Sequence, residues 1–144
     1  MLFIKIKRFI PFTTKQMFCL VNDIENYSKF LDNCTSAKIE NYEKNELTAT
    51  LQIKKGSINS FFTTKNYLYP YKKIEMYLLN GPIKNLRGFW KFEEFNKGSI
   101  IELKLALELD NYFINKSIKF ILDIYSKKIL NSFYERAKYL YGKK

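Results

Sequence analysis

One stretch of the chain, from Asn111 to Tyr141, contains neither glycine nor proline and is followed by Gly142. Its apolar side chains recur at steps of three and four, which predicts one amphipathic helix roughly 40 Å long at 1.5 Å per residue. Asn111 suits the N-cap, and Gly142 suits the C′ position, where φ turns positive. A helix this long in a chain of 144 residues needs a broad apolar surface to pack against. The apolar positions are Ile114, Ile118, Ile121, Tyr125, Ile129, Phe133, Ala137 and Leu140.

The segment between Cys34 and Leu109 supplies that surface, because it consists of short runs in which apolar and polar residues alternate. A period of two predicts strands with one buried face, and turn residues separate the runs. The predicted strands are Thr35–Tyr42, Glu46–Lys54, Ile58–Tyr69, Lys73–Asn80, Lys84–Phe95 and Ser99–Leu109, preceded by an edge strand at Met1–Ile10.

Two short helices are predicted between the first strand and the second. Thr13 and Gln16 have the spacing of a capping box, which predicts a helix at Thr14–Asn22, and a second helix is predicted near Glu25–Leu31. The order of elements predicts an α+β protein. Its fold is a curved seven-stranded antiparallel sheet around a long C-terminal helix, in one domain spanning residues 1–144.

The residue types of common catalytic and metal sites are absent or scattered. The chain has no histidine, the commonest general base near neutral pH. Cys19 and Cys34 lack the spacing of a zinc site or a disulfide framework, and we interpret them as reduced structural thiols. Glu93 and Glu94 are neighbours on a strand, so they point to opposite faces. We therefore predict a protein that is not an enzyme, with no catalytic residue, no metal and no resident cofactor.

The inner face of the predicted sheet is apolar but carries the polar residues Ser60, Thr64 and Asn66, and Gly88 removes a side chain from its middle. Such a wall is typical of a lipid or quinone pocket, and equally of the open mouth of a curved sheet where water satisfies the polar groups. The first interpretation predicts a ligand cavity lined by Leu51, Ile53, Phe62, Thr64, Met76, Leu78, Trp90, Phe92, Leu105, Ile121 and Tyr125.

The net charge of +11 allows two interpretations. Such a charge attracts RNA, ribosomes or an anionic membrane surface. However, lysine outnumbers arginine 22 to 3, which also fits a biased base composition and solvated lysines without any partner. The residues predicted to contact phosphates under the first interpretation are Lys54, Lys55, Lys65, Lys84, Arg87, Lys91 and Lys104.

No apolar run is long enough to cross a membrane, and Lys5, Lys7 and Arg8 interrupt the first strand in a way that does not fit a secretory signal. We expect a cytoplasmic protein, with peripheral contact to the inner membrane as a further expectation from its charge.

Several sequence strings, in a fixed order along almost the whole chain, resemble the coenzyme Q-binding family of START-like, polyketide cyclase-like proteins. The resemblance is greatest to the bacterial branch of that family, the RatA-type ribosome association toxins. The strings are Pro11-Phe12, Gln16-Met17, Val21-Asn22-Asp23, Tyr27, Phe30-Leu31, Cys34-Thr35, Phe62-Thr63-Thr64-Lys65-Asn66, Leu79-Asn80-Gly81-Pro82, Lys84-Asn85-Leu86, Gly88-Phe89-Trp90-Lys91-Phe92, Phe133, Arg136-Ala137-Lys138 and Tyr141-Gly142.

This resemblance implies a START-like helix-grip fold and two functions. One is non-enzymatic binding of ubiquinone, a polyprenyl quinone, in support of respiratory electron transfer. The alternative is binding to the large ribosomal subunit so that subunit association is blocked, with a small ubiquitin-like antitoxin as a further partner. We favour the quinone function here, because a respiratory role fits the biased composition of a reduced genome. Ile83, where the family has Phe, and Asp32-Asn33, where it has Pro, depart from the pattern.

Overall fold

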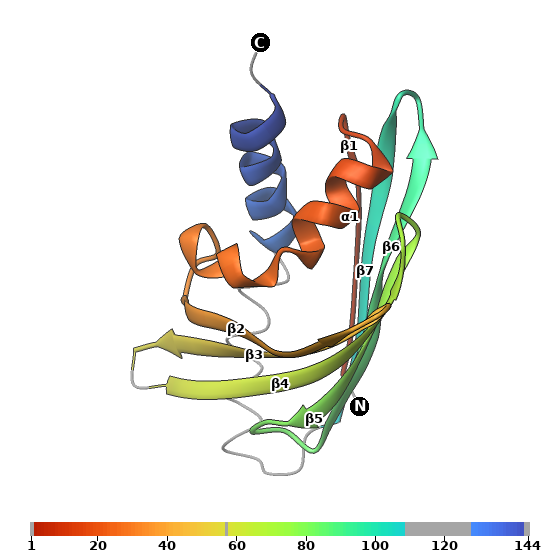
Figure 1. The fold of residues 1–144 in the computed structure, drawn as a ribbon. Coiled ribbons are helices and arrows are strands. Elements are labelled where there is room, and N and C mark those ends of the chain that lie inside the picture. Colours follow the sequence, from red (N-terminus) through yellow and green to blue (C-terminus); the bar gives the residue numbers. More distant parts are fainter. Residues whose placement is uncertain (1, 57, 109–127, 143–144) are drawn as a thin grey trace.

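The computed structural model describes residues 2–56, 58–108 and 128–142. The elements in chain order are β1 (Leu2–Ile10), α1 (Thr14–Asn22), a short 3-10 helix η1 (Ile24–Lys29), β2 (Cys34–Glu43), β3 (Glu46–Lys55), β4 (Ile58–Tyr69), β5 (Lys73–Asn80), β6 (Asn85–Phe95) and β7 (Gly98–Glu108). A C-terminal helix follows at residues 128–141 (Figure 1).

The strands form one antiparallel sheet in the order β1-β7-β6-β5-β4-β3-β2. Strands β2 to β7 pair with their neighbours in sequence, while β1 pairs with β7. The sheet is strongly curved, and α1, η1 and the C-terminal helix lie on its concave side (Figure 1). This confirms the predicted seven-stranded antiparallel sheet wrapped around helices, and every predicted strand lies within two residues of its observed bounds.

Alternation along the strands places the predicted apolar residues on the concave face. On β3, Leu47, Ala49 and Ile53 are buried, and on β7 Ile101, Leu103 and Leu107 are buried. The residues between them, such as Thr48 and Lys104, belong to the opposite, convex face, because neighbouring strand residues point to opposite sides. One face of the sheet therefore forms the core and the other faces solvent.

Helix α1 begins with the predicted capping box. The backbone N–H of Gln16 donates to the Thr13 hydroxyl at 3.1 Å, and the N–H of Thr13 donates to Gln16 Oε1 at 3.0 Å. Two N–H groups at the helix start are thereby satisfied. The helix buries Met17, Phe18 and Leu20 against the sheet.

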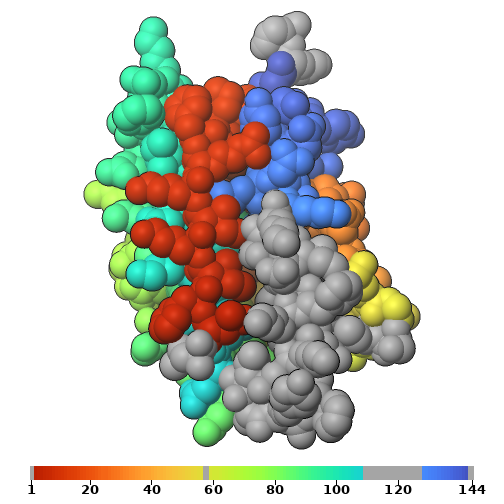
Figure 2. Space-filling view, turned by 180° about the vertical axis from the view of Figure 1, so that it is seen from behind, coloured from red at the N-terminus to blue at the C-terminus, as the bar shows by residue number. Residues whose placement is uncertain are grey.

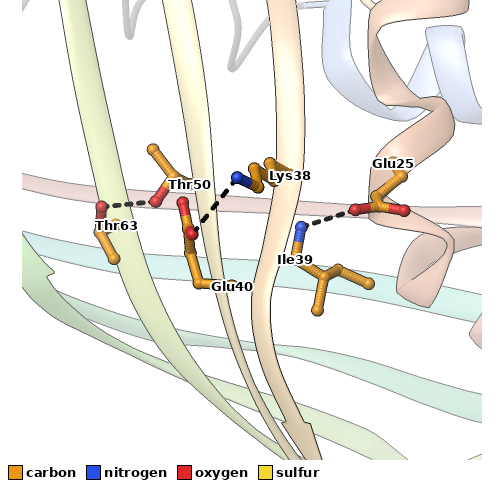
Figure 3. Close-up of polar contacts among 6 residues, drawn as sticks. All are labelled: Glu25, Lys38, Ile39, Glu40, Thr50 and Thr63. Atoms are coloured by element: carbon orange, nitrogen blue, oxygen red, sulfur yellow. Dashed lines mark hydrogen bonds and ion pairs between the residues drawn. The ribbon is translucent and has the colours of Figure 1, made fainter.

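The second predicted helix is a 3-10 helix that ends earlier than expected, at Lys29 rather than Leu31. Phe30 has φ −142°, outside the helical region, and Asn33 has a left-handed φ of 68°, so the chain turns sharply into β2. The carboxylate of Glu25 accepts the backbone N–H of Ile39 at 2.9 Å, which ties η1 to the edge strand β2 (Figure 3). This contact occupies a donor of an otherwise open sheet edge.

The C-terminal helix is described for residues 128–141 of the predicted Asn111–Tyr141, and the remainder of that prediction lies outside the described residues. Of the predicted apolar stripe, Phe133 and Ala137 are buried and Ile129 is half-buried, but Leu140 is exposed, and Leu130, which was not predicted, is buried beside Ile129. Arg8 of β1 donates to Asn131 Oδ1 at 3.2 Å, and the helix and β1 lie side by side (Figure 2).

Gly142 ends the helix for a different reason from the one predicted. Its φ is not positive; instead its N–H donates to the Lys138 carbonyl at 2.9 Å. A Cβ at this position would lie 2.7 Å from that same carbonyl oxygen, so the close approach of the backbone requires glycine.

Candidate functional site

A cavity of about 190 Å³ lies between the concave face of the sheet and the helices. Its wall combines the middle of β3 to β7 with one side of α1, η1 and the C-terminal helix. The described residues that line it are Val21, Ile24, Tyr27, Leu31, Cys34, Ala49, Leu51, Ile53, Phe62, Thr64, Asn66, Ile74, Met76, Leu86, Trp90, Leu103, Leu105, Ile129 and Phe133. The wall is almost entirely apolar, which suits a hydrophobic ligand.

The structure brings together most of the residues predicted for this cavity. Leu51, Ile53, Phe62, Thr64, Met76, Trp90 and Leu105 all line it. Ile121 and Tyr125 lie outside the described residues. Whether a ligand occupies this space remains a prediction.

Leu78 and Phe92 do not line the cavity, which corrects their predicted place. Leu78 packs in a separate cluster with Ile83 and Leu86, where Ile83 is buried in place of the expected Phe. Phe92 packs edge to face on Phe18 of α1, with ring centroids 5.6 Å apart. Both residues have the predicted inward phase, but their side chains pack on these neighbours and are not part of the cavity lining.

The wall formed by α1 and η1 was missing from the predicted site. Val21, Ile24, Tyr27 and Leu31 come from this segment, and all four line the cavity. Their helical spacing marks them as one apolar face, which was a usable signal. Which part of the sheet this face would cover depends on tertiary docking, and the sequence pattern does not contain that information.

Thr64 and Asn66 are the polar pair in the cavity wall. The Thr64 hydroxyl donates to Asn66 Oδ1 at 2.8 Å, and Asn66 is only 5% exposed. This bond fixes the orientation of the Asn66 amide within an apolar surrounding. Ser60, expected beside them, does not line the cavity.

Tyr27 and Cys34 are held in their neutral forms. The Tyr27 hydroxyl donates to the Val21 carbonyl, and burial, followed by the nearby Cys34 and Asp23, raises its pKa. Burial also raises the pKa of the Cys34 thiol, which donates to the Ser36 carbonyl at 3.5 Å. A buried thiol with a raised pKa is a poor nucleophile. Among the residues that the structure describes, no cluster of three or more His, Cys, Asp or Glu side chains could hold a metal.

Gly88 has a different role from the predicted gap. A Cβ there would lie 2.1 Å from the Lys104 carbonyl oxygen and 2.7 Å from Leu105 Cδ2. The glycine therefore permits β6 and β7 to approach closely, and it is not part of the cavity wall.

The predicted basic residues do not form one cluster. Lys65 pairs with Glu46 at 3.2 Å and Lys84 with Glu108 at 3.6 Å, while Lys54 and Lys55 lie at the far end of β3. Arg87, Lys91 and Lys104 are exposed on neighbouring strands of the convex face. None of these three makes an ion pair with any residue that the structure describes. Arg87 and Lys104 line a shallow groove together with the aromatic residues Phe3, Tyr77 and Phe89.

Within the described ranges, no helix is both long enough and apolar enough to cross a membrane.

Comparison with known proteins supports the fold and the family. Over 134 residues the chain is 34% identical to a ribosome association toxin, RatA, of Vibrio cholerae, covering 92% of this chain and 93% of the relative. A crystal structure of a Thermus thermophilus protein superposes with a TM-score of 0.85 at 15% identity, covering 97% and 99% of the two chains.

The Zhui aromatase/cyclase of Streptomyces superposes with a TM-score of 0.84 at 12% identity, covering 95% of this chain and 93% of the cyclase. At these identities the two structures show a shared START-like fold. The family model described as polyketide cyclase, dehydrase and lipid transport matches residues 10–134. With this match and the toxin relative aligned over nearly the full length, the chain belongs to the polyketide cyclase, dehydrase and lipid transport family, in which it is similar to ribosome association toxins.

Proposed function

We propose that this protein binds the ribosome, with the large subunit as its target, and thereby hinders the joining of the subunits. The observation that carries the proposal is the 34% identity to a ribosome association toxin, extending over 92% of this chain and 93% of the relative. An alignment of this extent relates one whole domain to another, so a shared small module does not explain it.

The charge of the molecule supports this proposal. The net charge is +11, and exposed cations stand on the convex face without acidic partners among the described residues. Ribosomal RNA presents a dense array of phosphates, and cations bind phosphates with little dependence on sequence. The name of the toxin relative favours this function over the quinone function that the composition suggested.

The test is cosedimentation of the purified protein with separated large and small subunits in sucrose gradients, over a series of salt concentrations. We expect the protein in the large-subunit fraction at low salt, a steep loss of binding as salt rises, and fewer joined ribosomes when both subunits are mixed in its presence. Absence from the large-subunit fraction at the lowest salt, or binding that does not respond to salt, would contradict the proposal.

A second candidate function, binding of a hydrophobic ligand such as a polyprenyl quinone, is favoured by the cavity and its Thr64–Asn66 pair. The volume of about 190 Å³ restricts the ligand. Ligand pockets usually measure roughly 300–1,000 Å³, so a head group and a short part of a prenyl tail would fill this one. The rest of such a tail would extend outside the measured space.

Two variants on one strand test the cavity function. Ala49→Leu adds side-chain volume to the cavity wall, while Thr48→Leu makes a similar change on the convex face of β3. Native mass spectrometry and solvent extraction should find a lipid with the wild type and Thr48→Leu, and much less with Ala49→Leu. A protein that purifies without lipid, or equal lipid in both variants, would contradict a role for this cavity.

A further inference from the structure

The convex face of the sheet carries exposed aromatic side chains in register with exposed cations. Strand pairing aligns Phe3 with Ala106, Ala106 with Arg87, and Arg87 with Tyr77, in one row across four strands. The next row aligns Lys5, Lys104, Phe89 and Glu75. In Figure 2, β1 (red) and the adjoining β6 and β7 (green and cyan) form part of one exposed surface.

A shallow groove of about 310 Å³ runs between these two rows. Phe3 is 67% exposed and Tyr77 is 42% exposed, so both rings are available to a partner. The two rings are three inter-strand steps apart, roughly 14 Å at about 4.8 Å per step. This distance spans more than one nucleotide of an extended chain.

The electrostatics of the groove favour an anion. Glu75 is its acidic lining residue, and its carboxylate is already engaged by Lys73 at 2.9 Å and by the hydroxyls of Tyr69 and Tyr77 at 3.5 Å each. Arg87 and Lys104, by contrast, have no ion pair within the part of the chain that the structure describes. The two cations therefore remain available for phosphate groups.

We propose that this groove binds single-stranded RNA, with bases stacking on Phe3 and Tyr77 and phosphates contacting Arg87 and Lys104. Aromatic rings on a sheet bind unpaired bases without regard to sequence, and flanking cations bind the backbone. A duplex keeps its bases stacked and hidden, so it lacks the faces that the rings require. The inference rests on the proposed ribosome binding for its biological setting and names the surface through which such binding occurs.

The experiment is fluorescence anisotropy with a labelled single-stranded oligoribonucleotide of mixed sequence, compared with a duplex of the same length and with vesicles containing anionic lipid. The double variant R87A/K104A should weaken single-strand binding and reduce the slope of log affinity against log salt by about 1.4, which is about 0.7 for each lost cation. F3A and Y77A should each weaken binding by about 5- to 150-fold, which corresponds to the stacking contribution of one base.

K29A is the matched control, since Lys29 is an exposed cation on η1, on the concave side of the sheet and away from the groove. It should leave single-strand affinity within twofold of the wild type, and circular dichroism should show that every variant is folded. Unchanged RNA binding in R87A/K104A, equal or tighter binding of the duplex, or binding to vesicles without binding to RNA would each overturn the inference.

The same variants in ribosome cosedimentation separate this inference from the proposed function. If the wild type and R87A/K104A cosediment equally with the large subunit, the proposal that binding occurs through this groove fails, while the proposal of ribosome binding stands. If the wild type does not cosediment but binds the oligoribonucleotide through the groove, the proposed function fails while the RNA site stands.

Discussion

Trp90 of β6 and Phe133 of the C-terminal helix pack edge to face, with ring centroids 5.1 Å apart and an interplanar angle of 74°. Phe133 also contacts the rings of Tyr27 and Phe30, at 5.4 Å and 5.2 Å. One helical side chain therefore joins the sheet, η1 and the C-terminal helix, and it forms part of the cavity wall.

Phe133→Ala should lower the free energy of unfolding by about 3–5 kcal/mol, because it removes a ring that is 1% exposed and leaves a void where three elements meet. Urea denaturation followed by circular dichroism measures the loss. Tyr139→Ala on the same helix is the control, and it should change stability by less than about 0.5 kcal/mol, because Tyr139 is 73% exposed. Equal losses in the two variants would show that Phe133 does not hold the elements together.

The sheet could be predicted closely because its signals are local. Alternation placed Ala49 and Leu103 on the buried face, and turn residues such as Asn96 and Lys97, both with positive φ in the structure, marked the ends of strands. The capping box of Thr13 and Gln16 was predictable for the same reason.

The site was predicted less completely, because phase along a strand gives the face of a residue but not its place under the helices. Leu78 and Phe92 have the correct phase and still do not line the cavity. Tyr27 was visible as an apolar helical residue, but its position in the cavity wall follows from the docking of η1 against β2. Gly88 shows the same limit, since the strand approach that requires it is a tertiary contact.

Gly88→Ala should destabilise the protein by about 3 kcal/mol or more, because the new Cβ would meet a backbone oxygen at 2.1 Å and backbone cannot rotate away. Gly81→Ala is the matched control. Its Cβ would meet the movable Leu78 Cδ1 at 3.1 Å, and we expect a loss of about 1 kcal/mol or less. Thermal unfolding compares the two variants, and a mild effect at Gly88 would contradict the close approach of β6 and β7.

Stability should fall at alkaline pH because of Tyr27 and Cys34. Burial raises the pKa of both groups, so the folded protein keeps two protons that the unfolded chain releases from about pH 9 for cysteine and about pH 10 for tyrosine. Their contribution is complete below the unfolded pKa values and decreases as pH rises above them. For each retained proton, the free energy of unfolding falls by about 1.4 kcal/mol per pH unit between the pKa of the unfolded chain and the pKa of the folded protein.

Urea denaturation at successive pH values measures these slopes. Tyr27→Phe should be less stable at neutral pH, because it loses the hydrogen bond to Val21, but its decline above pH 10 should be shallower than in the wild type. Tyr139→Phe changes an exposed tyrosine and should retain the wild-type slope. The same slope in both variants would show that Tyr27 does not retain its proton in the folded state.

The Thr64–Asn66 hydrogen bond should contribute more to the free energy of unfolding than a half-buried hydroxyl pair on the other face of the sheet. Thr64→Val removes the hydroxyl and leaves the side-chain carbonyl oxygen of the buried Asn66 without a donor. The free energy of unfolding should fall by about 1–3 kcal/mol. The double variant Thr64→Val/Asn66→Leu removes donor and acceptor together. Its loss should be smaller than the sum of the two single losses, which a double-mutant cycle of unfolding free energies measures.

The Thr50 and Thr63 hydroxyls, 2.8 Å apart, provide the matched pair on the convex face (Figure 3). Water can replace either partner there, so Thr50→Val and Thr63→Val should each cost less than about 1 kcal/mol, with no measurable coupling between them. If the Thr64–Asn66 cycle were as additive as this one, water would already satisfy the polar pair, and the cavity would be an open, hydrated mouth. Strong coupling at Thr64–Asn66 alone would instead identify a dry wall in which a fixed amide is held ready for a polar group of a hydrophobic ligand.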